Sequence, residues 1–398
     1  MGLYISVPFC RTKCSYCNFA SDVFSKAAYE GYVARLLEDI ADTQRIASEV
    51  GCILPETVDS IYLGGGTPSI LDPGQLKRMF GALRKQFAVA PDAEVTVECA
   101  PGTLSPALID TLVECGVNRV SLGVQSFVDE EAQAVGRLHK RVTVLQEIAR
   151  LRQAGIANIN IDLIAGLPHQ TAESWTCSLS ETIATGVPHV SVYMLEVDED
   201  SRLGRELIAG GTRYHAHFVP DEEAISDFYL QACDSLNAAR VAQYEISNFA
   251  RAGGESRHNL KYWTRQPYIG FGVDAHSMLF ADDASEIKAL RFSAPDSLDS
   301  YMSRGSSTVT PVSEHGALEE SFFLGLRLNQ GVDLERLRAR FRRESVDACE
   351  LAIAECIREG LLEKRGIRIC LTARGRLLSN EVFGKFLTDE KAAGVESV

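Results

Sequence analysis

The sequence predicts an α/β fold: a partial (β/α)6 barrel of the TIM type, followed by a small helical, winged-helix-like C-terminal domain. Two observations carry this prediction. From residue 3 to about 196, short Val- and Ile-rich runs alternate with longer segments of helical period, as in parallel strands joined by helices. From about residue 315, arginine-rich helical segments precede two short apolar runs separated by Arg365-Gly366, which is typical of helices followed by a hairpin.

The first part of the chain contains six runs with the length and composition of buried strands. Asp72-Pro73 and Ser105-Pro106 have the residues of helix starts, and Gly116 and Gly155 follow final helical turns, where a left-handed cap is needed. Six such βα units favour a barrel, whole or partial, over an open sheet. The predicted strands are residues 3–7, 60–63, 94–98, 119–125, 158–164 and 189–195.

The pattern changes after the sixth strand. Residues 197–221 contain acidic and Gly-rich stretches and are expected to form a loop, and a helix is expected near 222–240. Residues 244–305 are rich in aromatic and turn residues without clear periodicity, as in a cap of strands and loops. We therefore predict three domains: a barrel over 1–221, an extension and cap over 222–312, and the winged-helix-like domain over 313–398.

Composition and charge exclude several classes of protein. Hydrophobic residues make up 45% of the 398-residue chain and charged residues 24%, as in folded globular proteins rather than disordered ones. The net charge of −14 argues against nonspecific binding of nucleic acid or anionic lipid. A basic excess between residues 334 and 376 leaves DNA binding as a minor alternative, although arginines at helical spacing usually form a solvated face.

The chain is expected to be cytoplasmic. No apolar run reaches the length of a membrane span, and residues 1–9 lack the basic start and apolar length of a signal peptide. Contact with a membrane is expected only through a partner protein.

The strongest local signal is the stretch that begins at Cys10 and continues through Cys14 to Cys17, directly after the first strand. A C-x3-C-x2-C loop can ligate three irons of a [4Fe-4S] cluster and leave the fourth iron open to a small molecule. The alternatives are a zinc site or free thiols. Structural zinc needs four ligands, and Asn18 and Phe19 stand where a fourth would be expected. The other eight cysteines show no ligand spacing and are predicted to be small core residues: Cys52, Cys99, Cys115, Cys177, Cys233, Cys349, Cys356 and Cys370.

Polar residues at the ends of the later strands predict a ligand site at the barrel mouth. Residues 64–68, Gly-Gly-Gly-Thr-Pro, follow the second strand and allow the backbone to approach a ligand closely. Glu98 ends the third strand, Gln125 ends the fourth and Asp162 lies in the fifth. Each could be a satisfied structural group, but their shared location favours a ligand. Arg137 could pair with a carboxylate, although an isolated arginine is usually exposed.

The cysteine loop on the first strand of a βα barrel resembles the radical S-adenosylmethionine (SAM) superfamily. The spacing of Gln125, Arg137 and Asp162 further resembles its coproporphyrinogen III oxidase-like branch, over nearly the whole chain. The resemblance implies that the open iron chelates the amino and carboxylate groups of SAM. It also implies a set of residues that contact SAM: Tyr4, Tyr16, Gly65, Gly66, Thr67, Glu98, Gln125, Arg137 and Asp162.

Two kinds of protein in this branch are candidates. The oxygen-independent coproporphyrinogen III oxidases, which decarboxylate two propionates, typically carry a further cysteine where this chain has Phe19, and they have a longer N-terminal extension. The haem chaperones share a His-Asn-x-x-Tyr-Trp stretch, which is found here at residues 258–263. We therefore predict a haem chaperone, keep the oxidase as the alternative, and expect oxidase activity to be weak or absent.

The resemblance implies that His258, Tyr262 and Trp263 bind haem as cargo, with the imidazole as iron ligand and the aromatic rings covering the macrocycle. Taken alone, a histidine beside aromatic residues is more often structural. The expected partners are haem and haem-accepting proteins, including respiratory-chain components. The sequence does not decide between a monomer and a homodimer.

Overall fold

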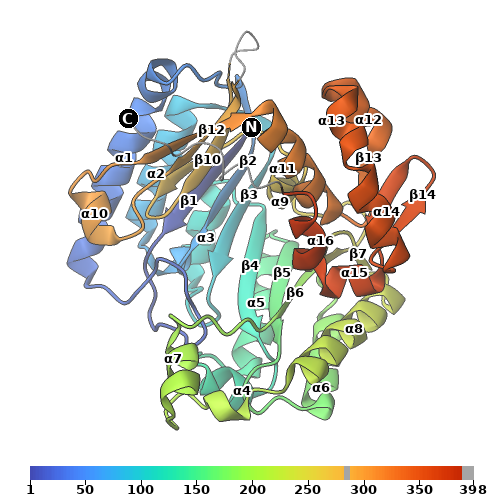
Figure 1. The fold of residues 1–398 in the computed structure, drawn as a ribbon. Coiled ribbons are helices and arrows are strands. Elements are labelled where there is room, and N and C mark those ends of the chain that lie inside the picture. Colours follow the sequence, from blue (N-terminus) through green and yellow to red (C-terminus); the bar gives the residue numbers. More distant parts are fainter. Residues whose placement is uncertain (282–286, 388–398) are drawn as a thin grey trace.

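The computed structural model of the protein describes residues 1–281 and 287–387. Residues 388–398 of the predicted C-terminal domain lie outside this description. One large sheet runs through most of the molecule (Figure 1), in the strand order β12-β11-β10-β9-β1-β2-β3-β4-β5-β6-β8-β7. Its two end strands, β12 and β7, are not paired with each other, so the barrel is partial.

The six predicted parallel strands are confirmed, and helices connect them as expected. Asp72 caps its helix with a reciprocal capping box, Ser105 caps the next one, and Gly116 and Gly155 have positive φ values of 72° and 92°. The elements are β1 (Gly2–Val7), α1 (Lys26–Glu49), β2 (Thr57–Gly65), η1 (Pro68–Ile70), α2 (Pro73–Gln86), β3 (Ala88–Cys99), α3 (Pro106–Glu114), β4 (Arg119–Gln125), α4 (Asp129–Ala134), α5 (Arg141–Gln153), β5 (Asn158–Ala165), α6 (Ala172–Thr185) and β6 (His189–Met194).

The expectation of a loop over residues 197–221 is wrong in part. The segment contains α7 (Arg202–Ala209) and η2 (Ala216–Phe218). Ser201 caps α7 by accepting a hydrogen bond from the Gly204 amide, and Leu203 is fully buried beneath it. α7 has two buried positions, which are too few to produce a recognisable helical period. The Gly-rich residues that follow it therefore determined the prediction of a loop.

The segment predicted as a cap extends the sheet at both edges. β7 (Ala242–Gln243) and β8 (Asn248–Ala250) add to the β6 edge, where β8 pairs antiparallel with β6. β9 pairs parallel with β1, and β10, β11 and β12 follow it antiparallel. The remaining bounds are α8 (Glu222–Ala238), α9 (Arg257–Trp263), β9 (Tyr268–Gly272), β10 (His276–Phe280), β11 (Ile287–Ser293), α10 (Leu298–Met302) and β12 (Thr308–Ser313).

Residues 314–387, called the C-terminal unit below, contain a three-stranded sheet of order β13-β15-β14. Their apolar residues form a second core together with residues of the large sheet such as Tyr268, Met278 and Ala289. The predicted helices followed by a hairpin are confirmed, since β14 and β15 pair antiparallel around Gly366. The elements are α11 (Glu314–Leu326), β13 (Val332–Asp333), α12 (Leu334–Arg340), α13 (Arg343–Ala348), α14 (Glu350–Arg358), β14 (Leu362–Arg365), β15 (Arg368–Leu371), α15 (Ala373–Leu377) and α16 (Ser379–Gly384). Among the described residues, no helix is long and apolar enough to cross a membrane.

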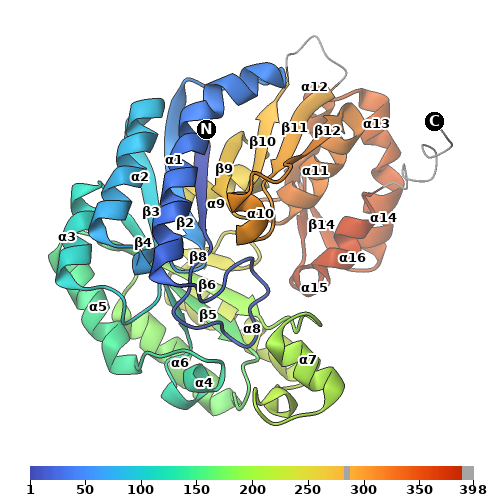
Figure 2. The same cartoon turned by 90° about the vertical axis from the view of Figure 1, so that its left-hand side faces the viewer.

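The two faces of the large sheet differ in polarity. On β3 to β6 the residues facing the outer helices (Figure 2) are apolar and fully buried, such as Val97, Leu122 and Ile161. The residues between them are polar and face inward, such as Glu98 and Ser121. The main apolar core therefore lies between the sheet and its helices, and the inner face encloses a polar cavity.

A buried ion-pair cluster joins the C-terminal unit to the sheet. Glu320 of α11 accepts from Arg265, which follows α9, at 2.5 Å, and from Arg291 of β11 at 2.6 Å. Arg265 is almost fully buried, so its charge depends on Glu320 for compensation.

We expect Glu320→Ala to lower the free energy of unfolding by about 3–5 kcal/mol, because it leaves the buried guanidinium of Arg265 without its carboxylate. Urea denaturation measures this loss. As a control, Glu335→Ala removes an exposed carboxylate paired with Arg338 and should cost less than about 1 kcal/mol. Equal losses in the two variants would contradict a special role for Glu320.

Candidate functional site

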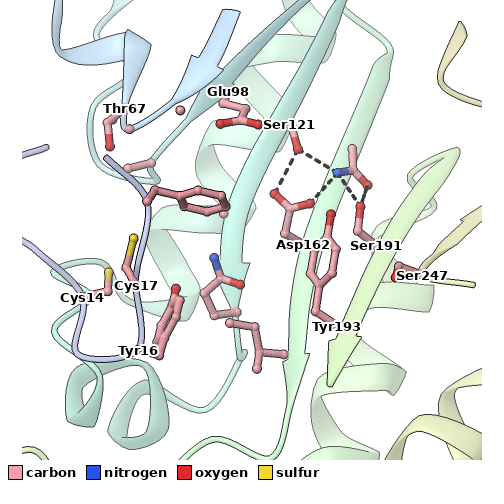
Figure 3. Close-up of a pocket in the computed structure, with 18 of the residues that line it drawn as sticks. Cys14, Tyr16, Cys17, Thr67, Glu98, Ser121, Asp162, Ser191, Tyr193 and Ser247 are labelled. Carbon is pink, nitrogen blue, oxygen red and sulfur yellow. Dashed lines mark hydrogen bonds between the residues drawn. The ribbon is translucent and has the colours of Figure 1, made fainter. Parts of the chain in front are cut away.

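The polar inner face encloses one large cavity of about 800 Å³, which is within the range of small-molecule sites. Arg119 and Gln125, at opposite ends of β4, both line it. At about 3.3 Å per residue, the cavity therefore extends about 20 Å along that strand. Figure 3 shows part of its wall, with the cysteine loop on one side and the polar residues of β4 to β6 on the other.

The cysteine loop lies between β1 and α1 at the mouth of this cavity, and Cys10, Cys14 and Cys17 all line it. Several contacts from distant parts of the chain hold the loop. The Ser15 amide donates to the Val135 carbonyl at 3.2 Å, and the Thr12 hydroxyl donates to the Gly136 carbonyl at 3.0 Å. The loop is thus anchored on the segment that follows β4.

The surroundings of the thiols suit sulfur ligands of an iron–sulfur cluster. The hydroxyls of Ser21 and Thr67 lie 3.7 Å from Cys10 Sγ, and Arg137 Nη1 donates to Cys14 Sγ at 3.5 Å. Burial raises the pKa of Cys10 and Cys17. Nearby donors of this kind stabilise thiolates and tune cluster sulfurs. No group of three His, Cys, Asp or Glu side chains in residues 1–281 and 287–387 could hold a single metal ion.

Cys99, predicted to be a core residue, does belong to the main core but also lines the cavity. Its thiol donates to the Val97 carbonyl at 3.7 Å, and burial strongly raises its pKa. A neutral, hydrogen-bonded thiol is a poor metal ligand. The cavity therefore offers three loop thiols as cluster ligands.

The glycines at the end of β2 allow the backbone to approach the cysteine loop closely. A Cβ atom at Gly66 would lie 2.7 Å from the Phe9 carbonyl oxygen, and one at Gly64 would lie 2.9 Å from the Glu98 carboxyl group. Gly65 has φ +95°, a conformation that side chains disfavour. Because side chains here would clash with the neighbouring atoms, only glycines let this segment contact both the loop and the cavity.

Two carboxyl groups lie in the cavity wall. The Tyr62 hydroxyl donates to Glu98 at 2.7 Å, and Asp162 accepts from Ser121 at 3.0 Å and from Asn160 at 2.7 Å. Burial, with a smaller contribution from the charge of Asp162, raises the pKa of Glu98 to about 7, although the hydrogen bond from Tyr62 acts to lower it. Burial also raises the pKa of Asp162.

Arg137 and Gln125 supply a cation and an amide with unused hydrogen-bonding capacity. Buried atoms without a partner include Arg137 Nε and Gln125 Oε1. Gln125 adopts a positive φ of 69° at an irregularity in the pairing of β4 with β5, and a Cβ atom at Gly123 would lie 2.5 Å from the Arg137 guanidinium. Buried polar atoms without partners are rare and are expected where a ligand binds.

The structure brings most of the predicted SAM residues to this one cavity. Its lining includes Tyr16, Gly65, Gly66, Thr67, Glu98, Gln125, Arg137 and Asp162. Tyr4 instead lines a neighbouring cavity of about 260 Å³, together with Tyr262 and Tyr268. Phe19 and Gly65 line both cavities.

The residues predicted to bind haem lie on α9, with different surroundings. His258 is fully buried, and both ring nitrogens are engaged at 2.9 Å: Nδ1 with the Ser60 hydroxyl and Nε2 with the Tyr262 hydroxyl. Burial lowers the pKa of His258 to about 3, so the ring is neutral. Trp263 packs under the guanidinium of Arg327, 4.3 Å from the ring centroid. Asn259, which was not predicted, is the motif residue that lines the large cavity.

Sequence reasoning also missed a polar network on the inner face. Asn160 connects Ser121, Asp162 and Ser191, and its Oδ1 accepts from His189 Nδ1 at 2.6 Å. His189 in turn contacts the Tyr244 hydroxyl at 2.9 Å. The signal for these residues was present, since every second position of β4 and β6, and of β5 up to Asp162, is polar or glycine. The other missed lining residues on strands are Tyr62, Thr96, Arg119, Gly123, Ile164, Tyr193 and Met194.

Two family models match the chain. Residues 4–176 match the radical SAM superfamily, and residues 312–378 match the HemN C-terminal domain. The first match covers the cysteine loop and β1 to β5, and the second covers most of the C-terminal unit.

Several relatives match over nearly the whole chain. The haem chaperone HemW of Lactococcus lactis is 33% identical over 392 residues, with 97% of each chain covered. HemW of Bacillus subtilis is 33% identical over 387 residues, with 96% of this chain and 98% of the relative covered. The solved structure of coproporphyrinogen III oxidase (HemN) from Escherichia coli, a radical SAM enzyme, superposes with a TM-score of 0.81 at 22% identity and covers 97% of this chain and 89% of its own, which shows the same fold.

We expect Glu98→Gln to stabilise the iron-free protein at alkaline pH. The pKa of Glu98 is about 7 in the folded protein and about 4.5 in the unfolded chain, so the wild type loses stability as the pH rises through this window. At pH 8 the variant should gain about 1–3 kcal/mol in the free energy of unfolding, and the gain should shrink towards pH 5. Urea denaturation at both pH values measures it, with the exposed Glu114→Gln as the control. A gain that does not depend on pH would contradict the prediction.

Proposed function

The chain belongs to the HemW family within the radical SAM superfamily, and we propose that it is a haem chaperone, which binds haem and delivers it to haem-requiring proteins. The observation that carries this proposal is the identity of about 33% to chaperones of distant bacteria over nearly the full length of both chains. Membership of the superfamily implies a [4Fe-4S] cluster and SAM as cofactors.

The residues present fit these cofactors. Three thiols on one loop would hold three irons and leave one iron for SAM, whose bound form supplies radical chemistry in this superfamily. Glu98 and Asp162 offer acceptors, while Arg137 and Gln125 have buried atoms without partners. Together with Tyr4, Tyr16, Gly65, Gly66 and Thr67, they are the residues we propose for SAM binding.

For the haem itself we propose the motif on α9, with His258 as the iron ligand. Coordination requires that one ring nitrogen give up its present partner, either Ser60 or Tyr262. Nε2 is the better candidate, because its partner Tyr262 lines the smaller cavity, whereas Ser60 lines neither cavity. The recipients we propose are haem-accepting proteins, including respiratory-chain components.

The alternative is a coproporphyrinogen-decarboxylating oxidase. The superposition on HemN shows only the fold, and Phe19 stands where the oxidases resembled by this chain carry a cysteine. Phe19 follows the cysteine loop and lines the large cavity, so the difference lies at the proposed cofactor site. Anaerobic incubation with coproporphyrinogen III, SAM and a reductant should give no protoporphyrinogen, and clear formation of this product would replace the chaperone proposal.

Anaerobic reconstitution with iron and sulfide should load about four irons per chain, and addition of SAM should change the electron paramagnetic resonance spectrum of the reduced cluster. Cys17→Ser should abolish both results. The matched control is Cys177→Ser, which changes an exposed cysteine outside the loop and should load normally. Failure of the wild type to load would remove the basis for the SAM site.

Haem titration followed by absorbance tests the role of His258. His258→Ala should weaken haem binding at least 10-fold, since it removes the iron ligand. Tyr262→Phe should preserve or strengthen binding, because it frees Nε2 from its hydrogen bond. The exposed His217→Ala is the control. If His258→Ala binds haem like the wild type while retaining its fold by circular dichroism, His258 is not the ligand.

A further inference from the structure

Much of the large cavity is not accounted for by the proposed cluster and SAM residues. Those residues gather at the cysteine loop and the carboxyl ends of the strands. The opposite part is lined by residues at the strand starts, by Asn259 of α9, and by five residues of the C-terminal unit: Arg327, Arg376, Leu377, Ser379 and Asn380. The C-terminal unit, orange to red in Figure 1, thus contributes two cations to the cavity wall.

The side chain of Arg327 is held in place by packing, but its hydrogen-bonding capacity is not fully used. Its guanidinium lies over the Trp263 ring at 4.3 Å, and Nη2 is 3.9 Å from the Glu245 carboxylate, beyond hydrogen-bonding distance. Arg327 Nε and Trp263 Nε1 are both buried without a hydrogen-bond partner. Arg327 lines the cavity wall, and Trp263 lies directly beneath its guanidinium. A buried donor without a partner in a cavity wall indicates an acceptor that is supplied by a ligand.

Glu245 does not serve as that acceptor. It is fully buried. Oε1 accepts from the Asn248 amide, and Oε2, which has no hydrogen-bond partner, stays 3.9 Å from Arg327 Nη2. Burial raises its pKa in spite of Arg327, which favours the neutral form of the carboxyl group. The charge of Arg327 is therefore only partly compensated by the protein.

Arg376 on α15 is the second cation. Nη1 donates to the Leu371 carbonyl at 3.3 Å, and within the described part of the chain Arg376 forms no ion pair. Several other arginines of the same unit are paired; for example, Arg338 contacts three carboxylates, and Arg368 pairs with Asp333. Arg376 differs from them in that it lines the cavity.

We propose that Arg327 and Arg376 form a carboxylate-binding subsite that receives two carboxylate groups of a ligand in the large cavity, with Asn259 as an additional amide donor. Guanidinium groups bind carboxylates through charge-assisted, often bidentate hydrogen bonds, and these are stronger in a partly enclosed site than in water. This inference rests on the proposed function, under which the two carboxylates are the propionates of haem.

The subsite connects the α9 motif with the C-terminal unit. Trp263 packs on Arg327, and Asn259 lies one residue after His258 and faces the cavity. A ligand whose carboxylates lie at Arg327 and Arg376 would therefore contact α9 with its carboxylate-bearing end. Under this proposal, the C-terminal unit takes part in binding the carboxylates of the ligand.

Titration of the full-length protein with haem and with haem dimethyl ester tests the proposal. Haem should bind the wild type more tightly than the ester, whose propionates carry no charge. Arg327→Gln and Arg376→Gln should each weaken haem binding about 10-fold, the loss of one charge-assisted contact. Neither substitution should change the binding of the ester. Arg327→Lys, which keeps the charge and the packing stem, should recover part of the affinity.

The matched control is Arg374→Gln, which lies on the same short helix but donates to the Glu359 carbonyl and does not line the cavity. It should bind haem like the wild type. If the ester binds as tightly as haem, or if both arginine variants keep wild-type affinity, the subsite is refuted while haem binding stands. If the wild type shows no saturable haem binding, the proposed function fails and the subsite fails with it.

Discussion

The structure depends on burying a polar face inside a barrel. In barrels of this type the interior is usually filled by branched apolar side chains. Here β3 to β6 turn acids, amides, hydroxyls and a histidine inward, and each such group needs a partner when it leaves water. Asn160 supplies several of these partners at once, and the apolar outer face of the same strands packs under the helices. The strands are stable because one face satisfies its polar groups while the other excludes water.

That arrangement explains where buried polar atoms of the protein lack a hydrogen-bond partner. Most inward polar groups of the strand starts have protein partners, whereas Gln125 and Arg137 near the cysteine loop and Arg327 at the opposite end keep buried atoms without one. The two places are separated along the cavity, and different parts of the chain build them. The loop after β1 forms one end, and α9 with the C-terminal unit forms the other. One cavity can thus hold a cofactor and a cargo side by side.

Much of this could be predicted from the sequence. Strand starts such as Arg119 and the caps at Asp72 and Ser105 are local signals, and the structure contains them where they were predicted. The role of Asn160 was not predicted, because its strand was interpreted as a continuous apolar run rather than as an alternation. The burial of His258 could not be predicted either, because Ser60, one of its partners, lies 198 residues away. Contacts of that kind follow from packing, which a single sequence does not reveal.

The pairing of β1 with β9 has a consequence for the order in which the protein can be completed. β1, which leads into the cysteine loop, lies between β2 and β9, and β9 spans residues 268–272. During synthesis, β1 therefore has one edge without a partner strand until residues 268–272 have left the ribosome. If iron is inserted only after β1 has paired with both β2 and β9, insertion must follow the synthesis of most of the polypeptide.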